Sequence, residues 1–185
     1  MSRERFHASI QQALLTLPQL LKLLLRMAED PDLPDGCRVL AAGAVIHWLS
    51  ASNTIRGLKG VLGYVDDILV MRLVLENIDS LAPEQMARYR SNTPDLLSVL
   101  DEELALTREY LGKNISVMER AAGSLGKLRF KGRTAEQCLQ DEEAANWLYD
   151  EVQSALIDLD LEEGAIARAV KGLDEAIELL KQRAG

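Results

Sequence analysis

The sequence predicts an all-α protein, a bundle of about six to seven helices, and three observations carry this prediction. Hydrophobic residues make up 48% of the 185 residues, but aromatic residues only 4%. Most of the apolar residues are leucine or alanine, which lose little conformational freedom in a helix. They recur at steps of three and four residues, and no segment shows the two-residue alternation of a half-buried strand.

The first fifty residues are expected to form two long helices. One is predicted over 7–29, where leucines repeat on one face. Pro18 lies inside this pattern and is expected to kink or divide the helix, because proline removes a backbone hydrogen bond. Residues 30–36 have the composition of a turn, and a second helix is predicted over 34–50 with Pro34 in its first turn.

The middle of the chain is less regular. Glycines at every third position predict a turn over 51–64, and a helix is expected to follow over 65–79, with Arg72 on its polar side. A short helix is predicted over 83–90. The clearest boundary is 91–94, where a threonine cap precedes a proline in the first helical turn.

Cleaner periodicity predicts three helices in the last ninety residues. The first is expected to run for about 27 residues from position 94. Thr134 and Gln137 match a capping box that opens the next helix. A short link at 160–163 predicts that the last two helices form an antiparallel hairpin. The predicted layout is thus a helical domain over 1–80, a connecting segment over 81–93 and a helical bundle over 94–185.

The net charge bears on the class of binding partner, and the cysteine content bears on the cellular compartment. The net charge is −8, and an acidic surface repels phosphate backbones, so nucleic-acid binding is not expected. Cys37 and Cys138 are expected to be buried, reduced side chains, which favours the cytoplasm. The longest uncharged apolar run, 39–49, is too short to cross a bilayer.

The segment from Ser50 to Asp67 resembles the signature of the YkvA-like family, small bacterial helical domains of unknown function that are often considered membrane-associated. The best match is the run Val61, Leu62, Gly63, Tyr64, Val65, Asp66 and Asp67. The resemblance covers about residues 25–80 and implies a fold more than an activity. The chain departs from the family at its prolines, replaced by Ala51, Arg56 and Gly60, and at its upstream acidic positions, which hold Asn53 and Gly57. A role that needs all four carboxylates, such as cation binding, is therefore not implied.

No catalytic residue, metal ligand or cofactor is predicted. His7 and His47 are the only histidines, and neither has the spacing of a zinc or di-iron motif. We expect His47 to be a partly buried core or interface residue. Asp66 and Asp67 are expected to cap and solvate a helix start. The alternative is a cation site, although adjacent helical residues diverge by about 100° and do not readily share one ligand.

A basic segment and four aromatic residues are the candidate interaction sites. Within seven residues, Lys127, Arg129, Lys131 and Arg133 surround Phe130, so the segment either binds an anionic surface or forms a loop whose charges pair locally. The candidate anchors are Trp48, Tyr64, Phe130 and Trp147. The predicted function is a non-catalytic adaptor that binds a partner protein or a second copy of itself. The alternative is a peripheral membrane protein that uses its amphipathic N-terminal helix and the basic loop.

Overall fold

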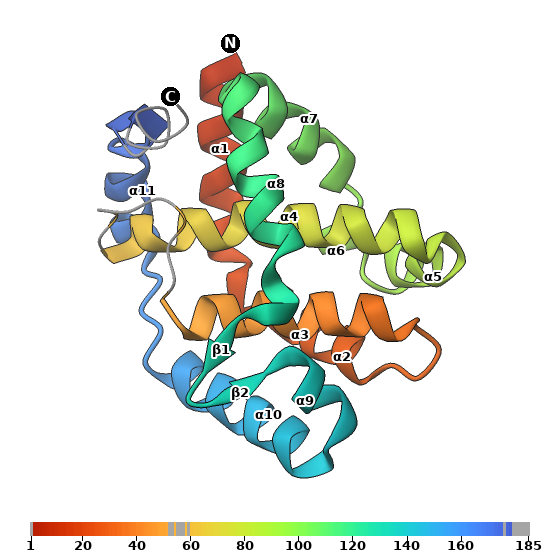
Figure 1. The fold of residues 1–185 in the computed structure, drawn as a ribbon. Coiled ribbons are helices and arrows are strands. Elements are labelled where there is room, and N and C mark those ends of the chain that lie inside the picture. Colours follow the sequence, from red (N-terminus) through yellow and green to blue (C-terminus); the bar gives the residue numbers. More distant parts are fainter. Residues whose placement is uncertain (1, 52–53, 55–57, 59, 176, 179–185) are drawn as a thin grey trace.

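The computed structural model describes residues 2–51, 54, 58, 60–175 and 177–178, and it confirms the all-α class (Figure 1). The predicted number of six to seven helices is wrong, because turns divide several of the predicted helices. The α-helices are α1 (Ser2–Leu15), α2 (Leu17–Glu29), α3 (Asp35–Leu49), α4 (Gly63–Leu81), α5 (Pro83–Asn92), α6 (Pro94–Leu97), α7 (Leu100–Leu111), α8 (Ile115–Gly123), α9 (Ala135–Gln140), α10 (Glu142–Ile157) and α11 (Glu163–Val170). The shorter elements are the 3₁₀ turns η1 (Gly60–Leu62), η2 (Gly112–Asn114) and η3 (Leu125–Lys127) and the strands β1 (Arg129–Phe130) and β2 (Arg133–Thr134).

Helix α4 lies at the centre of the molecule. In Figure 1 it crosses the middle of the view, with α1, α7 and α8 above it and α3 below it, and α4 contacts all four. Every residue from 65 to 75 is buried, so α4 has no solvent-facing side in this stretch. The expectation that Arg72 lies on a polar side is therefore wrong: its guanidinium is buried and donates hydrogen bonds to Ser9 and Glu103.

The division between α1 and α2 confirms the prediction made from Pro18. Helix α1 ends at Leu15, and α2 begins at Leu17 with the proline in its first turn, where a missing N–H costs nothing. The apolar side of α2 is buried, including Leu17, Leu21, Leu23, Leu24, Leu25 and Met27. The leucine-rich face is thus part of the core.

The C-terminal half does not form the predicted three-helix bundle. The expected 27-residue helix breaks at Gly112, whose φ of 55° suits glycine, and the chain turns so that α7 packs on α1 and α8 on α4. Helices α9 and α10 pack on α3 instead. The predicted hairpin is also wrong, because α11 leaves α10 and packs on α1 (Figure 1). The two predicted domains therefore share one hydrophobic core.

The segment between α8 and α9 forms a β-hairpin that the sequence did not predict. Arg129 pairs with Thr134, and Phe130 with Arg133, in antiparallel register. The two turn residues, Lys131 and Gly132, both have positive φ, at 46° and 84°, as the tight turn of a twisted hairpin requires. The capping box of Thr134 and Gln137 at the start of α9 is confirmed.

A hydrogen bond between Tyr89 and Asp30 fixes α5 against the turn after α2. The Tyr89 hydroxyl donates to Asp30 Oδ2 over 2.7 Å, and this bond is the largest cause of a pKa of Asp30 below its ordinary value of 3.8. A carboxyl with a lowered folded-state pKa contributes stability above its ordinary pKa and loses it as the pH falls through the folded-state value. We expect Tyr89→Phe to cost about 1 kcal/mol at pH 7, the small value reflecting a half-buried pair.

Urea unfolding at several pH values measures this effect. The difference between wild type and Tyr89→Phe should shrink as the pH falls below 3.8. Tyr149→Phe is the matched control, because Tyr149 makes no hydrogen bond within the described part of the chain, and it should match wild type throughout. A Tyr89→Phe difference that stays constant with pH would contradict the account.

Candidate functional site

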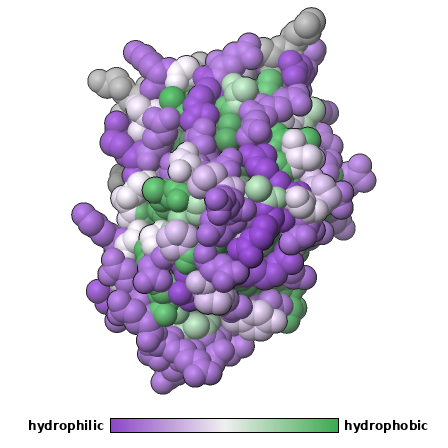
Figure 2. All heavy atoms as spheres, turned by 90° about the vertical axis from the view of Figure 1, so that its right-hand side faces the viewer, coloured by the Kyte–Doolittle hydropathy of each residue, from purple (hydrophilic) through white to green (hydrophobic). Residues whose placement is uncertain are grey.

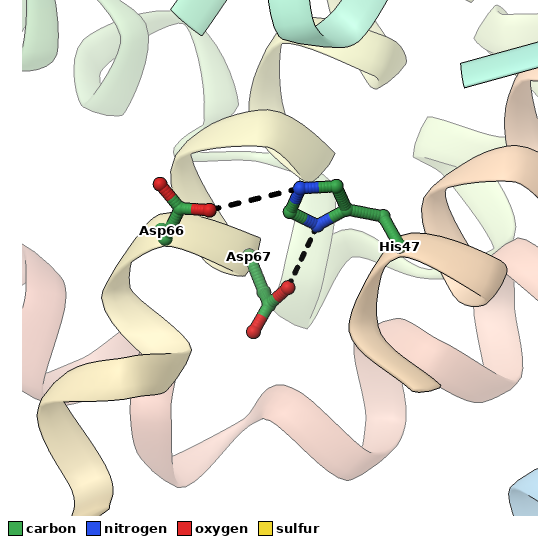
Figure 3. Close-up of side chains that lie close together, drawn as sticks. All are labelled: His47, Asp66 and Asp67. Carbon is green, nitrogen blue, oxygen red and sulfur yellow. Dashed lines mark hydrogen bonds and ion pairs between the residues drawn. The ribbon is translucent and has the colours of Figure 1, made fainter. Parts of the chain in front are cut away.

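The structure brings together His47, from the last turn of α3, and two aspartates from the start of α4 (Figure 3). His47 Nδ1 lies 2.8 Å from Asp67 Oδ1, and Nε2 lies 3.7 Å from Asp66 Oδ2. His47 is 4% exposed, Asp67 3% and Asp66 0%. Asp66 Oδ2 also accepts a hydrogen bond from the backbone N–H of Thr54, at 2.8 Å. The cluster is thus a buried junction between two packed helices.

The two aspartates reach one imidazole because they approach different nitrogens. Adjacent residues on α4 point in directions about 100° apart, and the ring of His47 lies between these directions (Figure 3). The predicted role of Asp66 and Asp67 as solvated capping residues is wrong, since both are buried. His47, predicted to be a partly buried core or interface residue, is buried, but nothing in the spacing of the three residues indicated that the aspartates are its partners.

The electrostatics of the cluster favour a charged imidazole. Burial alone lowers the pKa of His47, but the hydrogen bond from the ring to Asp67 and the charges of Asp67 and Asp66 outweigh it, so the pKa lies above its ordinary value of 6.5. The pKa of the nearby Tyr64 hydroxyl is raised by its own partial burial and, to a smaller extent, by the charge of Asp67. A bound proton on His47 therefore competes with any other cation that this cluster could hold.

A surface pocket of about 350 Å³ gives access to His47. His47 and Thr54 form one part of its lining, and the end of α8 with the segment after it contributes the rest: Ala121, Ser124, Leu125, Lys127 and Leu128. The lining thus combines apolar side chains with the polar groups of His47, Thr54 and Ser124 and the cation of Lys127. Although the histidine is nearly inaccessible, its neighbourhood is connected to solvent.

Two of the four side chains of the basic segment form ion pairs with helix α10. Lys131 Nζ lies 2.7 Å from Glu151, and Arg133 lies 3.1 Å from Glu143. Arg129 donates to the Gly132 carbonyl within the hairpin. Lys127 stands apart from the hairpin and lines the pocket above His47. Local pairing, one of the two interpretations of this segment, is what the structure shows for Lys131 and Arg133.

The four aromatic candidates are less exposed than anchors usually are. Trp48 is 7% exposed, and its indole N–H has no hydrogen-bond partner within the described part of the chain. Tyr64 is half-buried against the core. Phe130 and Trp147 are also half-buried and pack on each other, with ring centroids 6.1 Å apart. The fold explains all four as packing residues.

A groove of about 750 Å³, which the sequence did not predict, lies between α2, α6 and α10. Tyr149 of α10 lines it and is 48% exposed. Tyr149 follows Leu148, which belongs to the apolar stripe that α10 buries, so the tyrosine lies on the polar side of that stripe. This position is the signal in the sequence that could have identified Tyr149 as exposed. The lining residues are Gln12, Thr16, Gln19, Lys22, Leu25, Arg26, Glu29, Thr93, Asp95, Leu96, Tyr149 and Gln153.

Membrane insertion and homology give no further guide to the site. None of the helices in the described part of the chain combines the length and the apolar character needed to span a bilayer. Of the residues that carry the YkvA-like resemblance, 52–53, 55–57 and 59 lie outside the described residues, and the resemblance stays a prediction. Comparison with known proteins found no matching family model, no similar curated protein and no similar solved structure.

Proposed function

We propose that this chain is a non-catalytic binding protein, and that its groove between α2, α6 and α10 receives an acidic helical segment of a partner protein. The observation that carries the proposal is the groove itself, which is lined by two exposed cations and an exposed aromatic ring. Recognition of a partner helix by a groove on a rigid helical scaffold is a recurrent mode of protein binding.

The shape of the groove suits an elongated ligand. Gln19, Lys22, Arg26 and Glu29 follow one another at steps of three, four and three residues, so they form a stripe along one face of α2. Ten residues of helix extend over about 15 Å. The lining residues of α2 therefore extend over roughly three turns, and a partner helix lying along them could also meet the lining residues of α6 and α10.

The charges in the groove favour an acidic ligand. Lys22 and Arg26 are exposed and form no ion pair within the described part of the chain, although the protein carries a net charge of −8. Glu29 and Asp95 line the same groove, so a ligand must place its carboxylates near the two cations and away from these acids. Tyr149 offers an apolar ring with a polar tip, the kind of residue that often dominates binding energy.

Membrane association finds less support than protein binding. The leucines of α2 are buried in the core, and two cations of the hairpin are paired with glutamates. On the face shown in Figure 2, hydrophobic side chains are exposed in separate small areas among polar ones. We therefore treat lipid binding as a competing outcome of the test.

Affinity capture from native cells with matched variants tests the proposal. Tyr149→Ala and the double charge reversal Lys22→Glu, Arg26→Glu should each reduce recovery of the specific partner about tenfold or more. All three side chains are exposed, so the free energy of unfolding should change by no more than about 0.5 kcal/mol.

Ile157→Ala is the control, because Ile157 lies on the same helix α10, is 84% exposed and does not line the groove. It should recover the partner as wild type does. Equal recovery by the groove variants and wild type would refute the proposal. Recovery of anionic lipid without protein would support the membrane alternative, and recovery of a second copy of the chain would identify the acidic helix as its own.

A further inference from the structure

We propose that His47 and Asp66 form a binding site for a divalent transition-metal ion, such as Zn²⁺ or Mn²⁺, with Asp67 orienting the histidine. Nε2 of His47 faces Asp66 Oδ2 across 3.7 Å, which is too long for a good hydrogen bond. Two ligand atoms at this separation, each about 2.1 Å from a shared ion, subtend an angle of about 120° at the ion, close to tetrahedral geometry. The gap between the two atoms therefore has the size that a metal ion needs.

Asp67 supplies the second shell that histidine ligands of metals usually have. A metal-bound imidazole typically donates its other N–H to a carboxylate, which fixes the ring and makes the ligating nitrogen more basic. Here Nδ1 lies 2.8 Å from Asp67 Oδ1, on the opposite side of the ring from the gap (Figure 3). When a metal ion displaces the proton from Nε2, the Nδ1 proton stays with Asp67 and the lone pair of Nε2 is directed toward Asp66.

The setting of the site is compatible with metal entry and coordination. One ligand atom from each of His47, Asp66 and Asp67 lies within 4.8 Å of the others, and all three side chains are buried on two packed helices. The pocket beside His47 is lined by the histidine itself, so an ion can approach the site from the His47 side. An imidazole nitrogen with carboxylate oxygens suits Zn²⁺ or Mn²⁺ better than Ca²⁺, which prefers oxygen ligands alone.

Nuclear magnetic resonance of the untagged full chain, labelled with ¹⁵N in its histidine rings, tests this proposal directly. The chain has only two histidines, so the spectrum contains two imidazole systems, and His7→Gln assigns them. We expect Mn²⁺ to broaden the signals of His47 selectively, and Zn²⁺ to shift its Nε2 resonance. His7 is the internal control, because it also lies near a carboxylate, at 3.3 Å from Asp174, but in a more exposed place.

Variants then separate ligands from the positioning residue. In Zn²⁺ titrations followed by calorimetry, His47→Gln and Asp66→Asn should abolish binding at this site, Asp67→Asn should weaken it about 10–100-fold, and His7→Gln should leave it unchanged. Broadening of His7 alone, or no change in either histidine at millimolar Mn²⁺, would overturn the proposal. Because the spectra of the wild-type protein decide these outcomes, the test stands even if the Asp66 variant does not fold.

Discussion

Replacing Glu103 by alanine is expected to lower the free energy of unfolding by about 3–5 kcal/mol, the largest effect of any single polar substitution that we predict. Arg72 is 2% exposed and donates from Nη2 to Glu103 over 2.6 Å and to the Ser9 hydroxyl over 2.8 Å. Glu103 supplies the negative charge of this network. Without it, the guanidinium stays buried with only neutral partners, which is costly because burial in the core removes its hydration.

Glu102 provides a matched control for this experiment. It neighbours Glu103 on α7 and forms a 2.6 Å ion pair with Arg5, but both side chains of that pair are more than half exposed. Glu102→Ala should therefore change the stability by no more than about 1 kcal/mol. Chemical unfolding of the two variants gives the comparison. Similar losses for both would show that the buried network holding α1, α4 and α7 together contributes little.

Alanine in place of Gly43 is expected to destabilise the protein by about 1–3 kcal/mol, because it overpacks a close crossing of α3 and η3. A Cβ atom at this position would lie 2.7 Å from Leu125 Cβ and 3.2 Å from the Leu125 carbonyl group. The obstruction is partly backbone, so a change of side-chain rotamer cannot relieve it. The turn η3 must shift, and with it Leu125 in the wall of the pocket beside His47.

The same substitution at Gly36 should have the opposite sign. Gly36 is in the first turn of the same helix, is exposed, and has no atom within 4 Å of an added Cβ. Gly36→Ala should stabilise the protein by up to about 1 kcal/mol, since alanine restricts the unfolded chain and favours helix. Thermal and urea unfolding of both variants measure the effect. A stabilising Gly43→Ala would contradict the close packing of η3 on α3.

Local signals in the sequence predicted the local structure well. Pro18 predicts the division between α1 and α2, and Thr134 with Gln137 predicts the cap of α9, because each effect depends on residues within one helical turn. The packing of the C-terminal half was not predictable in the same way. Helices α7 and α10 have similar apolar stripes, and the stripes do not reveal that one packs on α1 and the other on α3.

The burial of the polar residues of α4 likewise depends on tertiary packing that the sequence does not reveal. Asp66, Asp67 and Arg72 are residue types that are usually exposed, yet all three are buried because α3, α7 and α1 supply partners for them. His47 is 19 residues before Asp66, and only the crossing of α3 and α4 places them together. The adjacent aspartates stand out in the sequence as candidates, but the histidine that lies between them does not. Tyr149 was missed because exposure depends on which helices leave it uncovered.

Site-specific photo-crosslinking in native cells decides whether the groove beside α2 is the binding surface. A photoreactive phenylalanine derivative, which keeps an aromatic ring at the position, replaces Tyr149 in one strain and Ile157 in another, two exposed positions of α10 that lie inside and outside the groove. We expect a single protein adduct from position 149 that Lys22→Glu with Arg26→Glu abolishes, and no such adduct from position 157. No adduct at position 149, or the same adduct from both positions, would contradict the proposed function.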